Sequence, residues 1–110
     1  MPNVGRLRGR RAFADLAQRG RTVRSGPLRV RYFAAPGTAC VGYAIGKRTG
    51  PAVVRNRIRR RLRAVIASSP TPLTSGFYLI SADSAAVGTP FDELAAAFSH
   101  AIETFAGASR

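Results

Sequence analysis

The chain has 110 residues, of which 45% are hydrophobic, and it carries a formal net charge of +13. This length supports one hydrophobic core and is too short for two comfortable domains, so we predict a single domain over residues 1–110. No apolar run approaches the roughly 20 residues of a membrane-spanning helix, and no apolar segment follows the arginine-rich start, so we expect a cytoplasmic protein.

The positive charge is concentrated in the first part of the chain. Residues 1–63 contain 17 of the 18 basic residues and one acidic residue, Asp15, whereas residues 64–110 have a net charge of −3. Such an uneven distribution is typical of a protein that binds a polyanion. The binding surface should therefore be built from residues 1–63.

A short basic helix is the first element predicted. Phe13, Leu16 and Ala17 recur at helical spacing within residues 10–19, and Gly20 is a typical C-terminal stop.

Two strands are predicted next, over residues 22–24 and 28–33. The second strand alternates, so one of its faces can enter a core. The core-facing side chains are Leu28, Val30 and Tyr32, and the opposite face shows Arg29, Arg31 and Phe33.

A third strand follows the Pro36-Gly37 turn, with one bulky and one small face. The bulky face has Val41, Tyr43 and Ile45, and the small face has Cys40, Gly42, Ala44 and Gly46. Backbone or a ligand can approach the small face closely. Cys40 is the only cysteine, so we expect a small buried residue and no disulfide.

The most informative segment is an arginine-rich helix that begins near Thr49-Gly50-Pro51 and runs to about Ser68. Its apolar stripe consists of Val54, Ile58, Leu62, Val65 and Ile66, and the opposite arc consists of Asn56, Arg57, Arg59, Arg60 and Arg63. Residues 55–63 hold six arginines. Guanidinium groups fork onto phosphate oxygens, and so many like charges repel one another without a polyanion, so the helix is predicted to bind nucleic acid.

The rest of the chain completes an α+β pattern. Pro70 and Pro72 end the arginine helix, residues 77–82 predict a buried strand, and Thr89-Pro90 begins a final amphipathic helix. The order of helix, strands, helix, strand and helix predicts one sheet with helices packed on it.

No catalytic residue or metal site is predicted in the chain itself. The single histidine, His100, lies in the final helix without a carboxylate pair nearby, and neither metal-ligand spacing nor a glycine-rich phosphate loop is present.

Three other classes of protein share parts of this pattern. A ribosomal or other structured-RNA-binding protein has similar charge and a similar core. A sequence-specific DNA-binding protein needs varied side chains on its recognition helix, whereas nearly all exposed positions here are arginine, so we expect no DNA partner. A helix lying on a membrane is also disfavoured, because its apolar stripe is needed by the core.

Residues 46–63 carry a more specific motif. Lys47 ends a strand, Gly50 lies in a turn, and Arg55-Asn56-Arg57 opens the basic run. Arg6-Leu7-Arg8, Phe13 and Arg19-Gly20 extend the match. Together with the element lengths, this pattern over roughly residues 6–105 resembles the protein subunit of bacterial ribonuclease P.

The resemblance implies a small basic protein that joins a catalytic RNA to remove the 5′ leader of precursor tRNA. In that family the RNA carries the chemistry with bound Mg²⁺, and the protein binds the leader and supports the folded ribozyme. The implied partners are ribonuclease P RNA and precursor tRNA. The implied fold has two layers, with three helices on a four-stranded sheet and a left-handed βαβ crossover through the Arg-Asn-Arg helix.

Two sets of binding residues follow from the resemblance. The set facing the ribozyme RNA is Lys47, Arg48, Arg55, Asn56, Arg57, Arg60, Arg61 and Arg63. The set binding the leader is Phe13, Arg29, Arg31 and Phe33. Ala17 departs from the family pattern, which often has a second aromatic residue there, so leader stacking is expected to be weaker or to move to Phe33. Whether Arg31 or Tyr32 faces the leader is left open.

Overall fold

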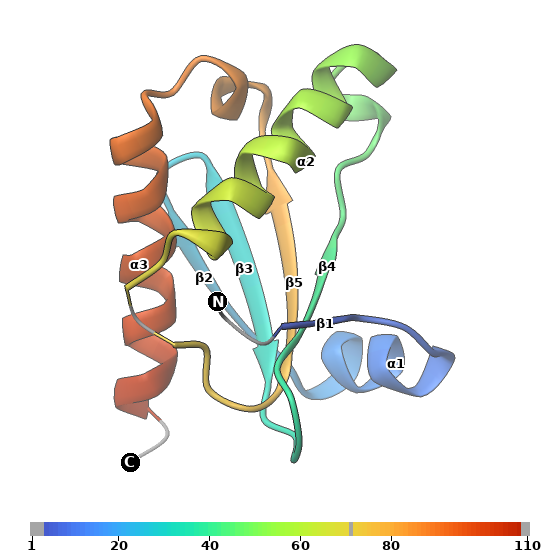
Figure 1. Ribbon diagram of the computed structural model, residues 1–110. Helices are drawn as coiled ribbons and strands as arrows, with labels where there is room; N and C mark the ends of the chain where they lie inside the picture. Colours follow the sequence, from blue (N-terminus) through green and yellow to red (C-terminus); the bar gives the residue numbers. More distant parts are fainter. Residues whose placement is uncertain (1–3, 71, 109–110) are drawn as a thin grey trace.

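The computed structural model describes residues 4–70 and 72–108 and contains one mixed sheet with helices on both faces (Figure 1). The elements in chain order are β1 (Gly5–Arg6), α1 (Arg10–Arg19), β2 (Arg21–Ser25), β3 (Leu28–Phe33), β4 (Cys40–Tyr43), the 3-10 helix η1 (Lys47–Thr49), α2 (Ala52–Ala67), β5 (Phe77–Ala82), the 3-10 helix η2 (Ser84–Val87) and α3 (Phe91–Ala108). The α+β class and the three predicted helices are confirmed.

The sheet has the order β1-β4-β5-β3-β2. β2, β3 and β5 pair antiparallel, whereas β4 pairs parallel with both β5 and β1. The predicted sheet had four strands, and the fifth is β1, which pairs only Gly5 and Arg6 with the edge of β4. A strand of two residues is too short to show an alternating pattern, so β1 could not be predicted from sequence periodicity.

The parallel strands β4 and β5 are neighbours joined through η1 and α2. In Figure 1 both strands run upward, α2 lies in front of the sheet, and the chain moves from β4 leftward to β5. This path is a left-handed crossover, as the resemblance implied. Nearly all parallel crossovers are right-handed, so general topology rules predict the opposite hand.

The main core lies between the sheet and the pair α2 and α3. Val30, Ile58, Leu62, Ile80 and Leu94 are fully buried there. The Tyr32 ring centroid lies 4.8 Å from that of Tyr78 and 5.0 Å from that of Phe105. Burial raises the pKa of Tyr78 to about 12, so its hydroxyl stays protonated and donates to the Thr74 carbonyl oxygen at 2.7 Å.

A second, smaller core holds α1 on the opposite face of the sheet. Its buried residues are Leu7, Ala12 and Leu16, and the partly buried side chains packed against them are Phe33, Cys40, Phe77 and Leu79. Cys40 is therefore partly rather than fully buried. Because α1 lies on the face not covered by α2 and α3, the molecule is locally thicker than the predicted two layers. None of the helices in the described part of the chain is long and apolar enough to cross a membrane.

Candidate nucleic-acid interface

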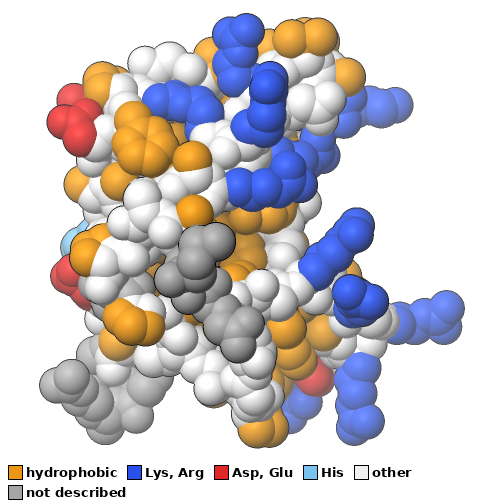
Figure 2. Space-filling view, viewed as in Figure 1, with side chains coloured by type: hydrophobic (Ala, Val, Ile, Leu, Met, Phe, Trp, Pro, Cys, Tyr) orange, Lys and Arg blue, Asp and Glu red, His pale blue; other side chains and the backbone are white. Residues whose placement is uncertain are grey.

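The exposed arc of α2 is the most basic feature of the molecule. Ile58, Leu62, Val65 and Ile66 are buried against the sheet and α3, as the apolar stripe predicted. The polar side of the helix is exposed at Asn56, Arg57, Arg60 and Arg63. Figure 2 shows arginine and lysine side chains spread over α2 and down the right-hand side of the molecule, whereas the acidic side chains in view lie mostly at the left, over α3.

The six arginines of α2 divide into two groups by their contacts. The Arg55 Nε donates to the Gly50 carbonyl oxygen at 3.1 Å. The Arg59 guanidinium donates to Asn56 Oδ1 at 3.0 Å and to the Ile45 carbonyl oxygen at 3.3 Å. In contrast, Arg57 and Arg60 are exposed and make no hydrogen bond or ion pair to any described residue. The predicted set therefore contains both structural and freely available guanidinium groups.

Arg61 differs most from its predicted orientation toward RNA. It is half-buried, and its guanidinium donates to the carbonyl oxygens of Ala86 at 2.6 Å and Val87 at 3.0 Å, and also to that of Thr89. These acceptors lie in η2 and the turn before α3. Arg61 therefore ties α2 to the following connection instead of standing free on the exposed arc.

Lys47 and Arg48 are exposed in η1, immediately before α2. The chain leaves η1 through Gly50, whose φ of 148° is a conformation that side chains with a Cβ rarely adopt. Beside η1, a hollow of about 440 Å³ opens between the ends of the strands. Its basic lining residues are Arg24, Arg29 and Arg48.

A second hollow of about 570 Å³ lies between β1, α1 and α2. Phe13, which is 44% exposed, lines this hollow together with Arg6, Tyr43, Arg59 and Arg63. The Arg63 guanidinium carbon lies 5.6 Å from the centroid of the Tyr43 ring. Burial raises the pKa of the Tyr43 hydroxyl, and the charge of Arg63 partly opposes that rise.

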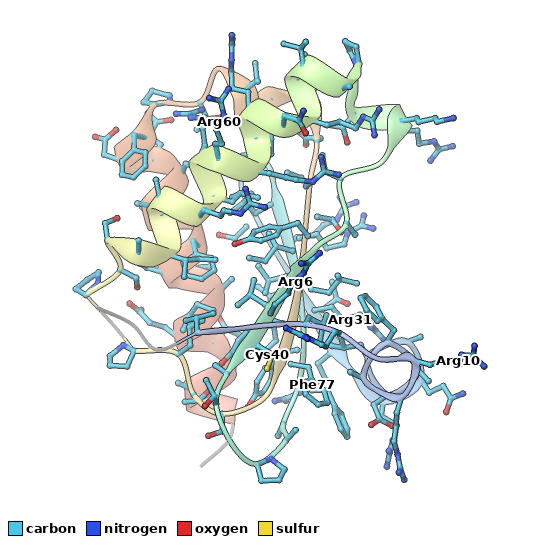
Figure 3. All side chains as sticks on the ribbon, turned by 45° about the vertical axis from the view of Figure 1, so that its right-hand side comes forward. Arg6, Arg10, Arg31, Cys40, Arg60 and Phe77 are labelled. Carbon is cyan, nitrogen blue, oxygen red and sulfur yellow. The ribbon has the colours of Figure 1, made fainter. Side chains whose placement is uncertain are left out.

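The prediction omitted Arg6 and Arg59 from both binding sets. The alternation in Arg6-Leu7-Arg8 is a signal that could have identified Arg6, because Leu7 is buried and the two arginines are exposed. Figure 3 shows Arg6 on the edge of the sheet between α1 and α2. Arg59 lies on the flank of α2, where half-burial and the contact to Ile45 depend on the tertiary fold.

The four predicted leader-binding residues do not form one patch. Phe13 lines the hollow at the β4 edge, and Arg29 lines the hollow beside η1. Arg31 and Phe33 face α1 instead: Arg31 donates to carbonyl oxygens at the end of α1, and the Phe33 ring lies 4.9 Å from the Arg19 guanidinium carbon. On β3, Arg31 lies on the α1 face and Tyr32 lies in the main core, whereas the choice between them as a leader-binding residue stays a prediction.

Almost none of the positive charge is neutralised by an ion pair among the described residues. Across residues 4–70 and 72–108 the one ion pair joins Arg19 and Asp15, at 2.6 Å. The same residues contain no group of three or more His, Cys, Asp or Glu side chains that could hold a metal ion. The site therefore offers guanidinium donors and aromatic rings, the groups that bind RNA phosphates and unpaired bases.

Comparison with known proteins agrees with this geometry. Residues 1–106 match the family model described as Ribonuclease P. A curated relative from Symbiobacterium thermophilum, named ribonuclease P protein component, is 37% identical over 97 residues, which is 86% of this chain and 84% of the relative. The protein of the same name from Acidothermus cellulolyticus is 37% identical over 103 residues, covering 89% of this chain and 85% of the relative.

Solved structures show the same fold at lower identity. The ribonuclease P protein of Staphylococcus aureus superposes with a TM-score of 0.76 at 18% identity, covering 90% of this chain and 93% of that chain. The ribonuclease P protein of Thermotoga maritima gives a TM-score of 0.77 at 16% identity, covering 90% and 96%. With the family match over nearly the whole sequence, the chain belongs to the ribonuclease P protein family.

Proposed function

We propose that this chain, as the protein component of the ribonuclease P ribonucleoprotein, binds the RNA subunit through the exposed arc of α2. We also propose that it binds the 5′ leader of precursor tRNA through the two hollows, and so promotes endonucleolytic removal of the leader. The observation that carries the proposal is the exposed group of Arg57, Arg60 and Arg63, which no described carboxylate neutralises.

The arc of α2 suits a folded RNA for physical reasons. Each guanidinium can bind phosphate oxygens through two donors, and its low hydration makes such a contact less costly than one from lysine. Asn56 adds directionality, because Arg59 donates to its Oδ1 and thereby leaves the side-chain amide nitrogen as an outward donor. A ribose hydroxyl or a phosphate oxygen is a suitable acceptor.

Leader binding is supported by an aromatic ring between arginines. Phe13 is exposed at the hollow that also contains Arg6 and Arg63, so an unpaired base can stack on the ring while its phosphates meet guanidinium groups. Such stacking is worth about 1–3 kcal/mol per base. Arg29 and Arg48 line the second hollow and provide further backbone contacts.

The cleavage chemistry belongs to the RNA subunit in this proposal, and Mg²⁺ held mainly by RNA phosphates would support hydrolysis there. Three of the protein's carboxylates, Asp92, Glu93 and Glu103, lie on α3, so the basic face offers the ion no cluster of ligands. The task of the protein residues is to bind and orient the RNA, and to offset phosphate repulsion where ribozyme and leader meet.

The test is cleavage of a precursor tRNA leader by the matched ribonuclease P RNA at low Mg²⁺, with and without the protein. We expect marked rescue by the protein and reduced rescue by the Arg57→Ala/Arg60→Ala double variant. An Arg11→Ala/Arg21→Ala variant is the control, because it removes the same charge from exposed sites outside α2. Equal losses in both variants indicate a general charge effect. Tight RNA binding without rescue favours a general structured-RNA-binding protein.

A further inference from the structure

We propose that Arg31 is a positioning residue that locks the C-terminal end of α1 onto the sheet and thereby sets the place of Phe13. Its importance for leader binding rests on the function proposed above, whereas its effect on α1 does not. In this assignment Arg31 makes no contact with the leader, although the sequence analysis included it in the leader-binding set.

The contacts of Arg31 use its whole guanidinium group. Nε donates to the Leu16 carbonyl oxygen, one terminal nitrogen donates to the Ala17 carbonyl oxygen at 3.0 Å, and the other donates to Thr22 Oγ1 at 2.7 Å. Figure 3 shows Arg31 directed from the sheet toward α1. The Leu16 carbonyl oxygen also accepts from the Gly20 amide at 3.0 Å, so Arg31 is a second donor to it. The C-terminal end of a helix carries partial negative charge, so a cation there is also a favourable electrostatic neighbour.

Gly20 explains why this arrangement fits. The residue has φ −72° and ψ 158°, an ordinary extended conformation, so backbone freedom is not the reason for glycine here. A Cβ at position 20 would lie 2.5 Å from the Leu16 carbonyl oxygen and 3.0 Å from Arg31 Nε. The missing side chain therefore leaves the space in which the carbonyl group and the guanidinium meet.

The other attachments of α1 form a small contact. Ala12 and Leu16 pack with Leu7 against partly buried side chains of the sheet, and the Arg19 guanidinium lies over the Phe33 ring, whereas the main core lies on the opposite face. Phe13 lies one turn before the carbonyl groups that Arg31 holds. Loss of the three hydrogen bonds should therefore loosen the end of α1 and displace the exposed ring.

Arg29 offers a matched control. It lies two residues away on the same face of β3, it is exposed, and it makes no hydrogen bond or ion pair within the described residues. If the strand face as a whole binds leader phosphates, the two arginines behave alike. If our assignment is correct, replacing Arg29 removes a phosphate contact, whereas replacing Arg31 loosens the end of α1.

The experiment compares Arg31→Met with Arg29→Met in the assembled holoenzyme and in the free protein. For Arg29→Met we expect the log–log salt slope of leader-dependent precursor tRNA affinity to fall by about 0.7, the value for one phosphate on a single strand. For Arg31→Met we expect weaker binding with an unchanged slope, and at least about tenfold faster hydrogen exchange of the α1 amides. A reduced slope with unchanged α1 exchange for Arg31→Met overturns the assignment.

Gly20→Ala crowds both the Leu16 carbonyl oxygen and the Arg31 guanidinium without changing any charge. We expect it to reproduce the fast α1 exchange and the weaker leader binding, and it decides the question if Arg31→Met does not fold. Unchanged α1 exchange in Gly20→Ala contradicts the positioning role. Phe13→Ala separates the two proposals. If this variant leaves leader affinity unchanged, the proposed leader site is wrong. The hydrogen-exchange data on Arg31→Met and Gly20→Ala still test the Arg31 contact in that case.

Discussion

At the residue scale, the direction of each guanidinium group decides what an arginine of α2 does. Arg55, Arg59 and Arg61 donate to backbone carbonyl groups of neighbouring elements, whereas Arg57 and Arg60 have no described partner. A charged hydrogen bond to a half-buried carbonyl stabilises the fold, while an exposed guanidinium beside other cations costs stability unless a phosphate arrives.

The adjacent pair Arg60 and Arg61 tests this difference. We expect Arg61→Gln to lower the free energy of unfolding by about 2 kcal/mol, because charged hydrogen bonds contribute roughly 1.5–3 kcal/mol and three carbonyl groups lose their donor. Arg60→Gln should change it by no more than about 0.5 kcal/mol and should weaken binding of ribonuclease P RNA instead. Denaturant unfolding and RNA titration of both variants measure the contrast, and equal stability of the two contradicts the structural role of Arg61.

Sequence periodicity foresaw part of this division. The 3.6-residue repeat correctly placed Arg57 and Arg60 on the exposed arc of α2, because that placement depends only on the buried stripe. The acceptors of Arg61 begin 25 residues later in the chain, so the repeat within α2 could not predict this contact. Arg31 is similar: strand alternation gave its face correctly, but the carbonyl groups it meets belong to α1, which packs there only in the folded molecule.

At the scale of elements, the helices and the longer strands could be predicted from the local sequence pattern, whereas the short elements in the connections could not. The bounds of α1, β3 and β5 agree with the prediction, because each has a clear apolar repeat or a bounded apolar run. The short elements β1, η1 and η2 have too few residues for a repeat. The predicted strand through Gly46 ends instead at Tyr43, although the Ala44 amide still donates to the Ile80 carbonyl oxygen at 2.8 Å. Lys47, expected at the end of that strand, is the first residue of η1.

The small face of β4 allows close packing, as its glycine spacing predicted. A Cβ at Gly42 would lie 2.9 Å from Leu7 Cδ2 and 3.1 Å from Leu7 Cβ, so Gly42→Ala must displace the segment that leads into α1. We expect a loss of about 1–3 kcal/mol in the free energy of unfolding, typical of overpacking.

Gly46→Ala is the matched control for this prediction. A Cβ at position 46 meets nothing within 4 Å, and its φ of −89° suits any residue. Its stability should be unchanged or rise by up to about 1 kcal/mol, because alanine restricts the unfolded chain. Thermal or denaturant unfolding of the two variants tests this prediction. A loss of stability in Gly46→Ala as large as that in Gly42→Ala argues against close packing as the cause.

At the scale of the whole molecule, charge is segregated between two sides. Residues 1–63 carry a net charge of +16, and the acidic side chains in view lie mostly over α3 (Figure 2). Such a distribution orients the protein as it approaches a polyanion and keeps its acidic side away from phosphates. The chain order contributes to this arrangement, because η1 directly precedes α2 and so places Lys47 and Arg48 beside the start of the arginine-rich helix.

The segregation predicts a strong dependence of RNA affinity on salt. If the protein engages roughly 6–10 phosphates, the affinity for ribonuclease P RNA should fall about 10³–10⁵-fold between about 50 and 200 mM salt. The Arg57→Ala/Arg60→Ala variant should lower the log–log slope by about 2, or one per lost phosphate contact. Glu103→Gln, on the acidic side, should leave the slope unchanged. Because counterion release requires phosphate neutralisation, a flat response in the unmodified protein is incompatible with an arginine face that binds RNA.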